Sequence, residues 1–82
     1  MYKVYIIYSE SSGSYYVGHT EDVSSRLLRH NNSGNKSTKK SKDWKLMYTE
    51  TFETRGEAMK RENAIKKKKS RKYIENLIRS TR

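Results

Sequence analysis

Hydrophobic residues gather in short stretches that predict two strands at the start of the chain. Residues 2–8, YKVYIIY, are β-branched or aromatic almost throughout, and the polar segment SESSGS follows them. This composition is typical of a strand that ends in a turn. Residues 14–18, SYYVG, then predict the returning strand. We therefore expect a β-hairpin in which Tyr5 lies close to Tyr16 and Val17, to within about two residues.

A third strand is expected at residues 44–52, WKLMYTETF. Alternation of side chains along this strand places one set of hydrophobic residues on a single face, namely Trp44, Leu46 and Tyr48. The preceding residues 33–43 are polar and basic without periodicity, which is typical of a loop.

The first helix is expected directly after the hairpin. Thr20 supplies a capping hydroxyl, and two acidic residues follow in the first turn, where the helix dipole favours negative charge. The segment DVSSRLLRHNN then turns Val23 and Leu27 toward a core and ends in asparagine, a common residue at helix ends. Arg26 and His30 are expected along the edge of the same face.

Two helices complete the predicted fold. In the segment TRGE, Thr54 and Glu57 match a capping box, and the helix that follows runs to about Lys68. Ser70 caps a last helix, whose hydrophobic stripe consists of Tyr73, Ile74, Leu77 and Ile78. The order β-β-α-β-α-α predicts an α+β fold, a small three-stranded antiparallel sheet flanked by about three helices, in one domain over residues 1–82.

Charge is unevenly spread along the chain. The formal net charge is +10, and the basic residues are densest in residues 36–45, KSTKKSKDWK, and residues 60–72, KRENAIKKKKSRK. Two such runs favour a polyanion as partner, most simply a nucleic acid, over a surface that is merely solubilising. The side chains expected to contact phosphates are Lys36, Lys39, Lys40, Lys66, Lys67, Lys69, Arg71 and Lys72.

Composition also excludes several classes of protein. Without cysteine, neither a disulfide nor a thiolate zinc site can stabilise the chain. No apolar stretch approaches the roughly 20 residues that span a membrane, and no segment resembles a signal peptide. Neither a nucleophile-elbow serine nor a glycine-rich phosphate loop is present. The sequence therefore predicts a cytoplasmic protein with no membrane or disulfide partner.

Glu62 departs from the expected pattern. It lies between Ala58 and Ile65 on the apolar stripe of its helix, where an aliphatic residue is expected. A carboxylate that faces a core is costly unless it is paired, hydrogen-bonded or bound to a cation. Glu62 is therefore either a metal ligand or an ordinary edge residue paired with Arg26 or Lys66.

The other candidate positions have simple structural explanations when each is taken alone. Tyr5 and Tyr16 would be strand aromatics, and Arg26 a surface arginine. His30 would be a favourable cation near a helix C-terminus, and His19 a loop residue. Only their combination suggests chemistry.

Taken together, these positions resemble the GIY-YIG nuclease family. Val4-Tyr5 stands where the first motif has Ile-Tyr, although Lys3 replaces its glycine, and Tyr16-Val17-Gly18 stands where the second motif has Tyr-Ile-Gly. Arg26 matches the family's helix arginine, and Glu62 matches its metal-binding glutamate. The chain is most similar to the small stand-alone members, which are themselves similar to the nuclease domain of the bacterial excision-repair enzyme excinuclease ABC.

The resemblance implies a metal-dependent endonuclease that hydrolyses DNA phosphodiester bonds, on branched or damaged DNA such as repair enzymes process. It implies one divalent ion, Mg²⁺ or Mn²⁺, held by Glu62, with Arg26 on the phosphoryl oxygens. Tyr5 is assigned as the base, Tyr16 as the residue that orients the water, and His30 as a proton relay or phosphate contact. Nearby cations are expected to lower the pKa of Tyr5.

Two further points follow from the same resemblance. Asn76 is the candidate counterpart of a late asparagine found in some members, and the lack of a second DNA-binding domain argues against sequence-specific cleavage. A non-catalytic nucleic-acid-binding module with the same fold remains an alternative, as does a small protein-binding domain with a basic surface. The intact set of Tyr5, Tyr16, Arg26 and Glu62 favours the nuclease.

Overall fold

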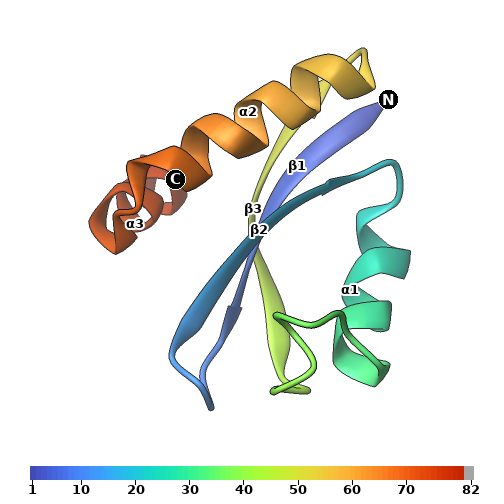
Figure 1. The fold of residues 1–82 in the computed structure, drawn as a ribbon, viewed down its shortest axis with the longest axis vertical. Coiled ribbons are helices and arrows are strands. Elements are labelled where there is room, and N and C mark those ends of the chain that lie inside the picture. The colour runs from blue at the N-terminus through green and yellow to red at the C-terminus, as the bar shows by residue number, and fades with distance from the viewer. Residues whose placement is uncertain (81–82) are drawn as a thin grey trace.

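The structure, a computed structural model, describes residues 1–80 and confirms the predicted α+β fold and element order (Figure 1). Three strands form one antiparallel sheet, in which β1 lies between β2 and β3. The elements are β1 (Tyr2–Ser9), β2 (Ser14–Thr20), α1 (Val23–Asn32), β3 (Trp44–Phe52), α2 (Arg55–Lys68) and α3 (Arg71–Ser80). Across residues 1–80, none of the helices is long and apolar enough to cross a membrane.

The β1–β2 hairpin brings the two tyrosine motifs together. Tyr5 pairs with Gly18, and Ile7 pairs with Tyr16, which is within the two-residue range expected from the sequence. Because side chains alternate along a strand, Tyr5 and Tyr16 share one face of the sheet, while Tyr15 points to the other face. The hairpin thus separates the two neighbouring tyrosines of β2.

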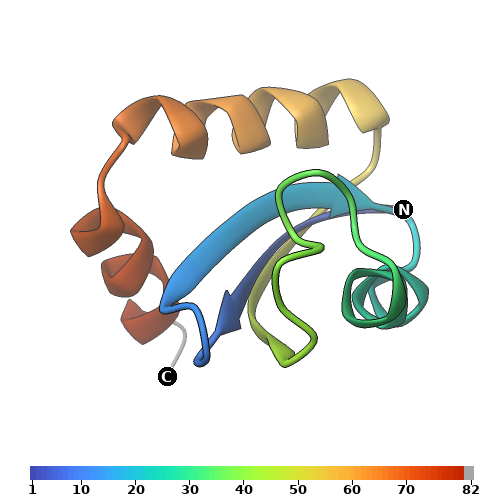
Figure 2. The same ribbon diagram turned by 60° about the horizontal axis from the view of Figure 1, so that its bottom comes forward.

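Helices cover both faces of the sheet, so the protein has two hydrophobic cores (Figure 2). On one face, α2 and α3 cover a buried cluster made of Val4, Ile6, Val17, Ala58 and Ile65. On the other face, α1 packs against a second cluster made of Tyr5, Ile7 and Trp44, with Tyr16, Val23 and Leu27 around it. The central strand β1 is therefore buried on both sides, and its Tyr5 hydroxyl lies within the second core.

The alternation predicted for β3 is wrong beyond Met47. The ladder with β1 shifts between Ile6 and Ile7, which leaves Met47 without a partner. A bulge of this kind changes which face the following side chains point to. Trp44 therefore packs in the α1-side core, while Tyr48 packs in the α2-side core.

The helix starts are largely those expected. The capping box at Thr54 and the Ser70 cap are confirmed, because each hydroxyl accepts a backbone hydrogen bond from the first turn of its helix. The assignment of Thr20 as the cap of α1 is wrong. Asp22 is the cap, since its carboxylate accepts from the Ser25 backbone N–H at 3.1 Å, and Thr20 instead accepts from the Asp22 N–H at 3.2 Å.

Gly18 allows the closest approach between the edge strand β2 and the Tyr5 side chain. A Cβ atom placed on Gly18 would lie 2.6 Å from the Tyr5 hydroxyl oxygen and 2.8 Å from Cζ. Tyr5 is only 2% exposed and has no room to move away. A residue without a side chain is therefore required for the Tyr5 hydroxyl to reach the edge of the sheet.

We expect Gly18→Ala to lower the free energy of unfolding by roughly 1–3 kcal/mol, the usual effect of overpacking a core. Gly56→Ala is the matched control. Gly56 lies in the first turn of α2 with nothing within 4 Å of an added Cβ, so alanine there should stabilise the protein by about 0.5–1 kcal/mol. Urea denaturation of both variants measures the difference, and equal effects would contradict the tight contact at Gly18.

Candidate active site

A buried hydrogen bond joins Tyr5 of β1 to His30 in the last turn of α1. The Tyr5 hydroxyl oxygen lies 2.8 Å from His30 Nε2. The two residues are 2% and 3% exposed, so water does not compete for this bond. The docking of α1 on the sheet therefore sets the geometry of the pair.

The loop after α1 holds the other side of the His30 ring. Thr38, which is completely buried, places its hydroxyl oxygen 2.7 Å from His30 Nδ1. The Asn35 backbone N–H donates to that hydroxyl at 2.9 Å, and Trp44 Nε1 donates to the Thr38 carbonyl at 2.9 Å. The sequence identified this loop only by its basic charge and missed Thr38 as a site residue.

These contacts fix the direction of the hydrogen bonds. The Thr38 hydroxyl donates to Asn35 Oδ1, so it accepts from His30 Nδ1–H. Burial, together with the charges of Arg26 and Arg29, lowers the pKa of His30 and keeps the ring neutral at pH 7. Nε2 is then the acceptor, and the Tyr5 hydroxyl donates to it.

The prediction that nearby cations lower the pKa of Tyr5 is wrong. Burial raises the pKa of Tyr5 to about 12, and the proximity of Tyr16 and Glu62 acts in the same direction. Arg26 acts in the opposite direction, but burial outweighs it. Tyr5 is therefore protonated at neutral pH and can accept a proton only as its own proton leaves.

Tyr16 and Arg26 lie beside this pair. The Tyr16 ring centre is 6.4 Å from that of Tyr5 and 5.1 Å from that of His30, and Asn35 Nδ2 donates to the Tyr16 hydroxyl at 3.0 Å. Arg26 is close enough for its charge to act on the pKa of both Tyr5 and His30. The structure thus brings four of the five predicted catalytic residues together on the α1 side.

Glu62 of α2, the fifth residue, is ionised and held at both oxygens. Its side chain is 13% exposed, with Oε1 2.5 Å from His19 Nδ1 and Oε2 2.5 Å from Lys66 Nζ. Burial raises the pKa of the carboxyl, but hydrogen bonds from Lys66 and His19 outweigh burial and leave that pKa below its ordinary value. The expected pairing with Lys66 is confirmed, whereas no ion pair with Arg26 occurs within residues 1–80.

His19 is a site residue that the sequence analysis placed wrongly. It was expected in a loop, but it lies within β2, one residue after Gly18. By alternation it shares the face of Tyr15 and Val17, which α2 covers. Continuing the strand past Gly18 would have placed His19 opposite the stripe that carries Glu62.

The two groups of residues lie on opposite faces of the sheet and meet around its edge strand. The Lys66 ammonium is 5.7 Å from the centre of the Tyr16 ring, and the Glu62 charge acts on the pKa of Tyr5. Gly18 lies between them on β2 and presents no side chain. A phosphodiester at this edge can therefore approach both groups.

The residues predicted to contact phosphates differ in how free they are. The exposed ones are Lys36, Lys39, Lys40, Lys67, Lys69 and Lys72. Lys66 is paired with Glu62, and Arg71 donates to the Gly13 carbonyl at 2.7 Å and to Glu75 at 3.2 Å, which ties α3 to the hairpin. Asn76 is exposed on α3, which Figures 1 and 2 show at the opposite end of the molecule from α1.

The surroundings of Glu62 fit a single hard cation. Across residues 1–80, no group of three or more His, Asp or Glu side chains could hold an ion unaided. Mg²⁺, however, is commonly bound through one or two carboxylates together with waters and substrate phosphates. The ionised Glu62 carboxylate, which already attracts the Lys66 ammonium, matches that kind of site.

Comparison with known proteins agrees with this geometry. A family model described as the GIY-YIG catalytic domain matches residues 1–74. The chain is 45% identical over 64 residues to a UPF0213 protein of Staphylococcus epidermidis, a match that covers 77% of each chain. It is 43% identical over 67 residues to a UPF0213 protein of Halobacterium salinarum, covering 80% of this chain and 86% of the relative. No solved structure matches the chain.

We expect the buried neutral His30 to make stability depend on pH. Its pKa is lower in the folded chain than its ordinary value near 6.5, so below pH 6.5 the unfolded chain binds more protons. The stabilisation is complete above pH 6.5 and is lost as pH falls through the folded pKa, with a slope of at most about 1.4 kcal/mol per pH unit. Urea denaturation from pH 7.5 to 5 should show this loss, and His30→Gln should flatten it. Parallel curves for the two proteins would contradict a buried neutral His30.

Proposed function

Because the chain belongs to the GIY-YIG nuclease family, we propose that it is a metal-dependent endonuclease that hydrolyses DNA, with branched or damaged DNA as its substrate. Phosphodiester hydrolysis requires an activated water, neutralised charge on the phosphoryl oxygens and a stabilised leaving oxygen. The observation that carries the proposal is the buried hydrogen bond from Tyr5 to His30, beside Arg26 and around the sheet edge from Glu62.

Tyr5 and His30 act together as the base. The attacking water gives a proton to the Tyr5 oxygen while the Tyr5 hydroxyl passes its own proton to His30 Nε2. The water oxygen then bonds to phosphorus, and the bond from phosphorus to the leaving oxygen breaks. This relay avoids a free tyrosinate, which would be scarce at neutral pH because the pKa of Tyr5 is about 12. Thr38 keeps the proton on Nδ1, so that Nε2 is ready to accept.

The remaining residues position the substrate. Tyr16, whose hydroxyl accepts from Asn35, keeps its own O–H free to orient the water. Arg26 donates to the non-bridging phosphoryl oxygens with a planar fork that suits them. Glu62 would hold one Mg²⁺ or Mn²⁺ ion, and His19 fixes its carboxylate. Such an ion, when bound, supplies Lewis-acid stabilisation of charge on the phosphate and the leaving oxygen.

One observation favours a second candidate, a nucleic-acid-binding module without turnover. Both oxygens of Glu62 are already engaged, by His19 and by Lys66. A carboxylate satisfied by an ammonium group has less need of a metal ion. Lys66 is 47% exposed, however, and its flexible side chain can leave Glu62 for a phosphate without unfolding α2.

A cleavage assay separates the two candidates. Labelled single-stranded, duplex and branched DNA are incubated with the protein in Mg²⁺, in Mn²⁺ and in chelator. The endonuclease proposal requires internal cleavage in metal that chelator abolishes. Binding without cleavage under every condition supports the module instead.

We expect Glu62→Gln to abolish metal-dependent cleavage but to preserve most DNA binding, because exposed lysines supply the binding charge. Glu53→Gln, which removes an exposed carboxylate just before α2, should leave the cleavage rate unchanged. Gel analysis gives the rate, and fluorescence anisotropy in chelator gives the affinity. Normal cleavage by Glu62→Gln would falsify its role as metal ligand.

We expect Tyr5→Phe to slow cleavage by roughly 10²–10⁴-fold, the usual effect of losing general-base help. The substitution removes only the hydroxyl. Tyr48→Phe is the matched control, because burial and the Glu50 carboxylate raise the pKa of Tyr48 to about 12 as well, but on the opposite side of the sheet. Equal rates for the two variants would contradict the base. A dead Tyr16→Phe beside an active Tyr5→Phe would exchange the two tyrosine roles.

A further inference from the structure

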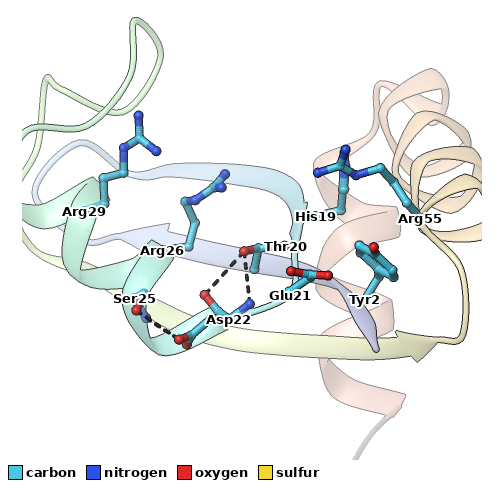
Figure 3. Close-up of a pocket in the computed structure, with 9 residues that line it drawn as sticks. All are labelled: Tyr2, His19, Thr20, Glu21, Asp22, Ser25, Arg26, Arg29 and Arg55. Carbon is cyan, nitrogen blue, oxygen red and sulfur yellow. Dashed lines mark hydrogen bonds between the residues drawn. The ribbon is translucent and has the colours of Figure 1, made fainter.

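A hollow of about 560 Å³ lies at the C-terminal end of β2, between the first turns of α1 and α2 (Figure 3). Arg26 and Arg29 extend from α1 on one side of it, and His19 and Arg55 extend on the other. We name it the arginine hollow after Arg26, Arg29 and Arg55. The lysine runs that suggested nucleic acid binding contribute nothing to its lining.

Arg29 and Arg55 are exposed and have no carboxylate partner within residues 1–80. Arg55 lies over the Tyr2 ring at 5.9 Å, which orients its guanidinium without neutralising it. By contrast, Arg61 is bound at two atoms by Glu50, and Arg71 is tied to α3 and the hairpin. The arginines of the hollow thus keep their donors for a ligand, and their planar forks suit phosphate oxygens.

The hollow opens onto the candidate active site. Arg26 lines the hollow and also acts on Tyr5, while His19 lines it and also bonds Glu62. A second hollow of about 360 Å³ lies toward the other end of β2, and we name it the lysine hollow after Lys40, Lys66 and Lys69 in its lining. Gly18 lies between the β2 residues of the two hollows. Basic hollows therefore flank the active site on both sides along one edge strand.

We propose that the arginine hollow binds the phosphodiester backbone of the substrate strand, on the opposite side of the scissile bond from the lysine hollow. The strand follows the outer edge of β2, with the scissile phosphate at Gly18 and a neighbouring phosphate between Arg29 and Arg55. This placement rests on the proposed nuclease function, and it assigns a binding role to two arginines outside the lysine runs.

Two acidic residues also line the arginine hollow, and they affect the proposal differently. The Asp22 carboxylate is used by the first turn of α1, where it accepts from the Ser25 N–H and hydroxyl. Glu21 is exposed, and its negative charge faces the same space (Figure 3). A phosphate in the hollow is therefore opposed by Glu21 alone, which provides a substitution with the opposite expected sign.

The test measures binding of labelled single-stranded and duplex oligonucleotides by anisotropy in chelator, across a range of salt concentrations. Each phosphate contact contributes about 0.7 to the log–log salt slope on single strands and about 0.9 on duplex. We expect Arg29→Ala/Arg55→Ala to reduce the slope by roughly 1.4 or 1.8 respectively, and to weaken binding roughly 10-fold or more at low salt. Glu21→Gln should tighten binding.

Two controls separate charge from other effects. Arg79→Ala removes an exposed arginine from α3, away from β2, and should leave the salt slope unchanged. Arg55→Lys keeps the charge and should retain the slope while losing part of the affinity, because lysine cannot form the paired hydrogen bonds.

The outcomes distinguish this inference from the proposed function. Wild-type slope and affinity in the double variant overturn the arginine hollow, even when the protein cleaves DNA. A reduced slope in a protein that never cleaves supports the hollow and contradicts the nuclease. Weaker binding by Glu21→Gln also overturns the proposed path of the strand.

Discussion

The buried hydrogen bond from Tyr5 to His30 holds together three segments that are distant in the sequence: β1, the end of α1 and the loop that contains Thr38. Both partners lie in a core, so breaking the bond would leave unsatisfied polar atoms at a cost of about 1–3 kcal/mol for each group. The same burial raises the pKa of Tyr5 and lowers that of His30. Stability and proton transfer thus depend on one interaction.

The edge strand β2 links that core to the rest of the candidate site. Its alternation sends Tyr16 to the α1 side and His19 to the α2 side, and Gly18 leaves the edge open between them. Substrate can then approach a tyrosine–histidine base and a carboxylate that the sheet would otherwise separate. The arginines follow a similar division: Arg61 and Arg71 hold elements together, whereas Arg29 and Arg55 keep their charge for a ligand.

Local features of the fold were predictable from the sequence, whereas features set by distant contacts were not. The capping box at Thr54 and the inward position of Glu62 follow from spacing within one helix. The bulge at Met47 depends on how β3 pairs with β1, and no signal within β3 reveals it. Thr38 is a site residue only because the loop folds back onto His30, and the pKa of Tyr5 was misjudged because its burial depends on α1 docking.

The central claim is that a protonated Tyr5 donates to a neutral His30 whose proton is on Nδ1. The most direct test is the ¹⁵N chemical shifts of the His30 ring at pH 7, measured through their couplings to the ring carbon-bound protons. The structure predicts a neutral ring with a protonated Nδ1 and a bare Nε2 that accepts a hydrogen bond. An imidazolium, or a neutral ring with its proton on Nε2, would contradict the account, because neither could accept the Tyr5 proton.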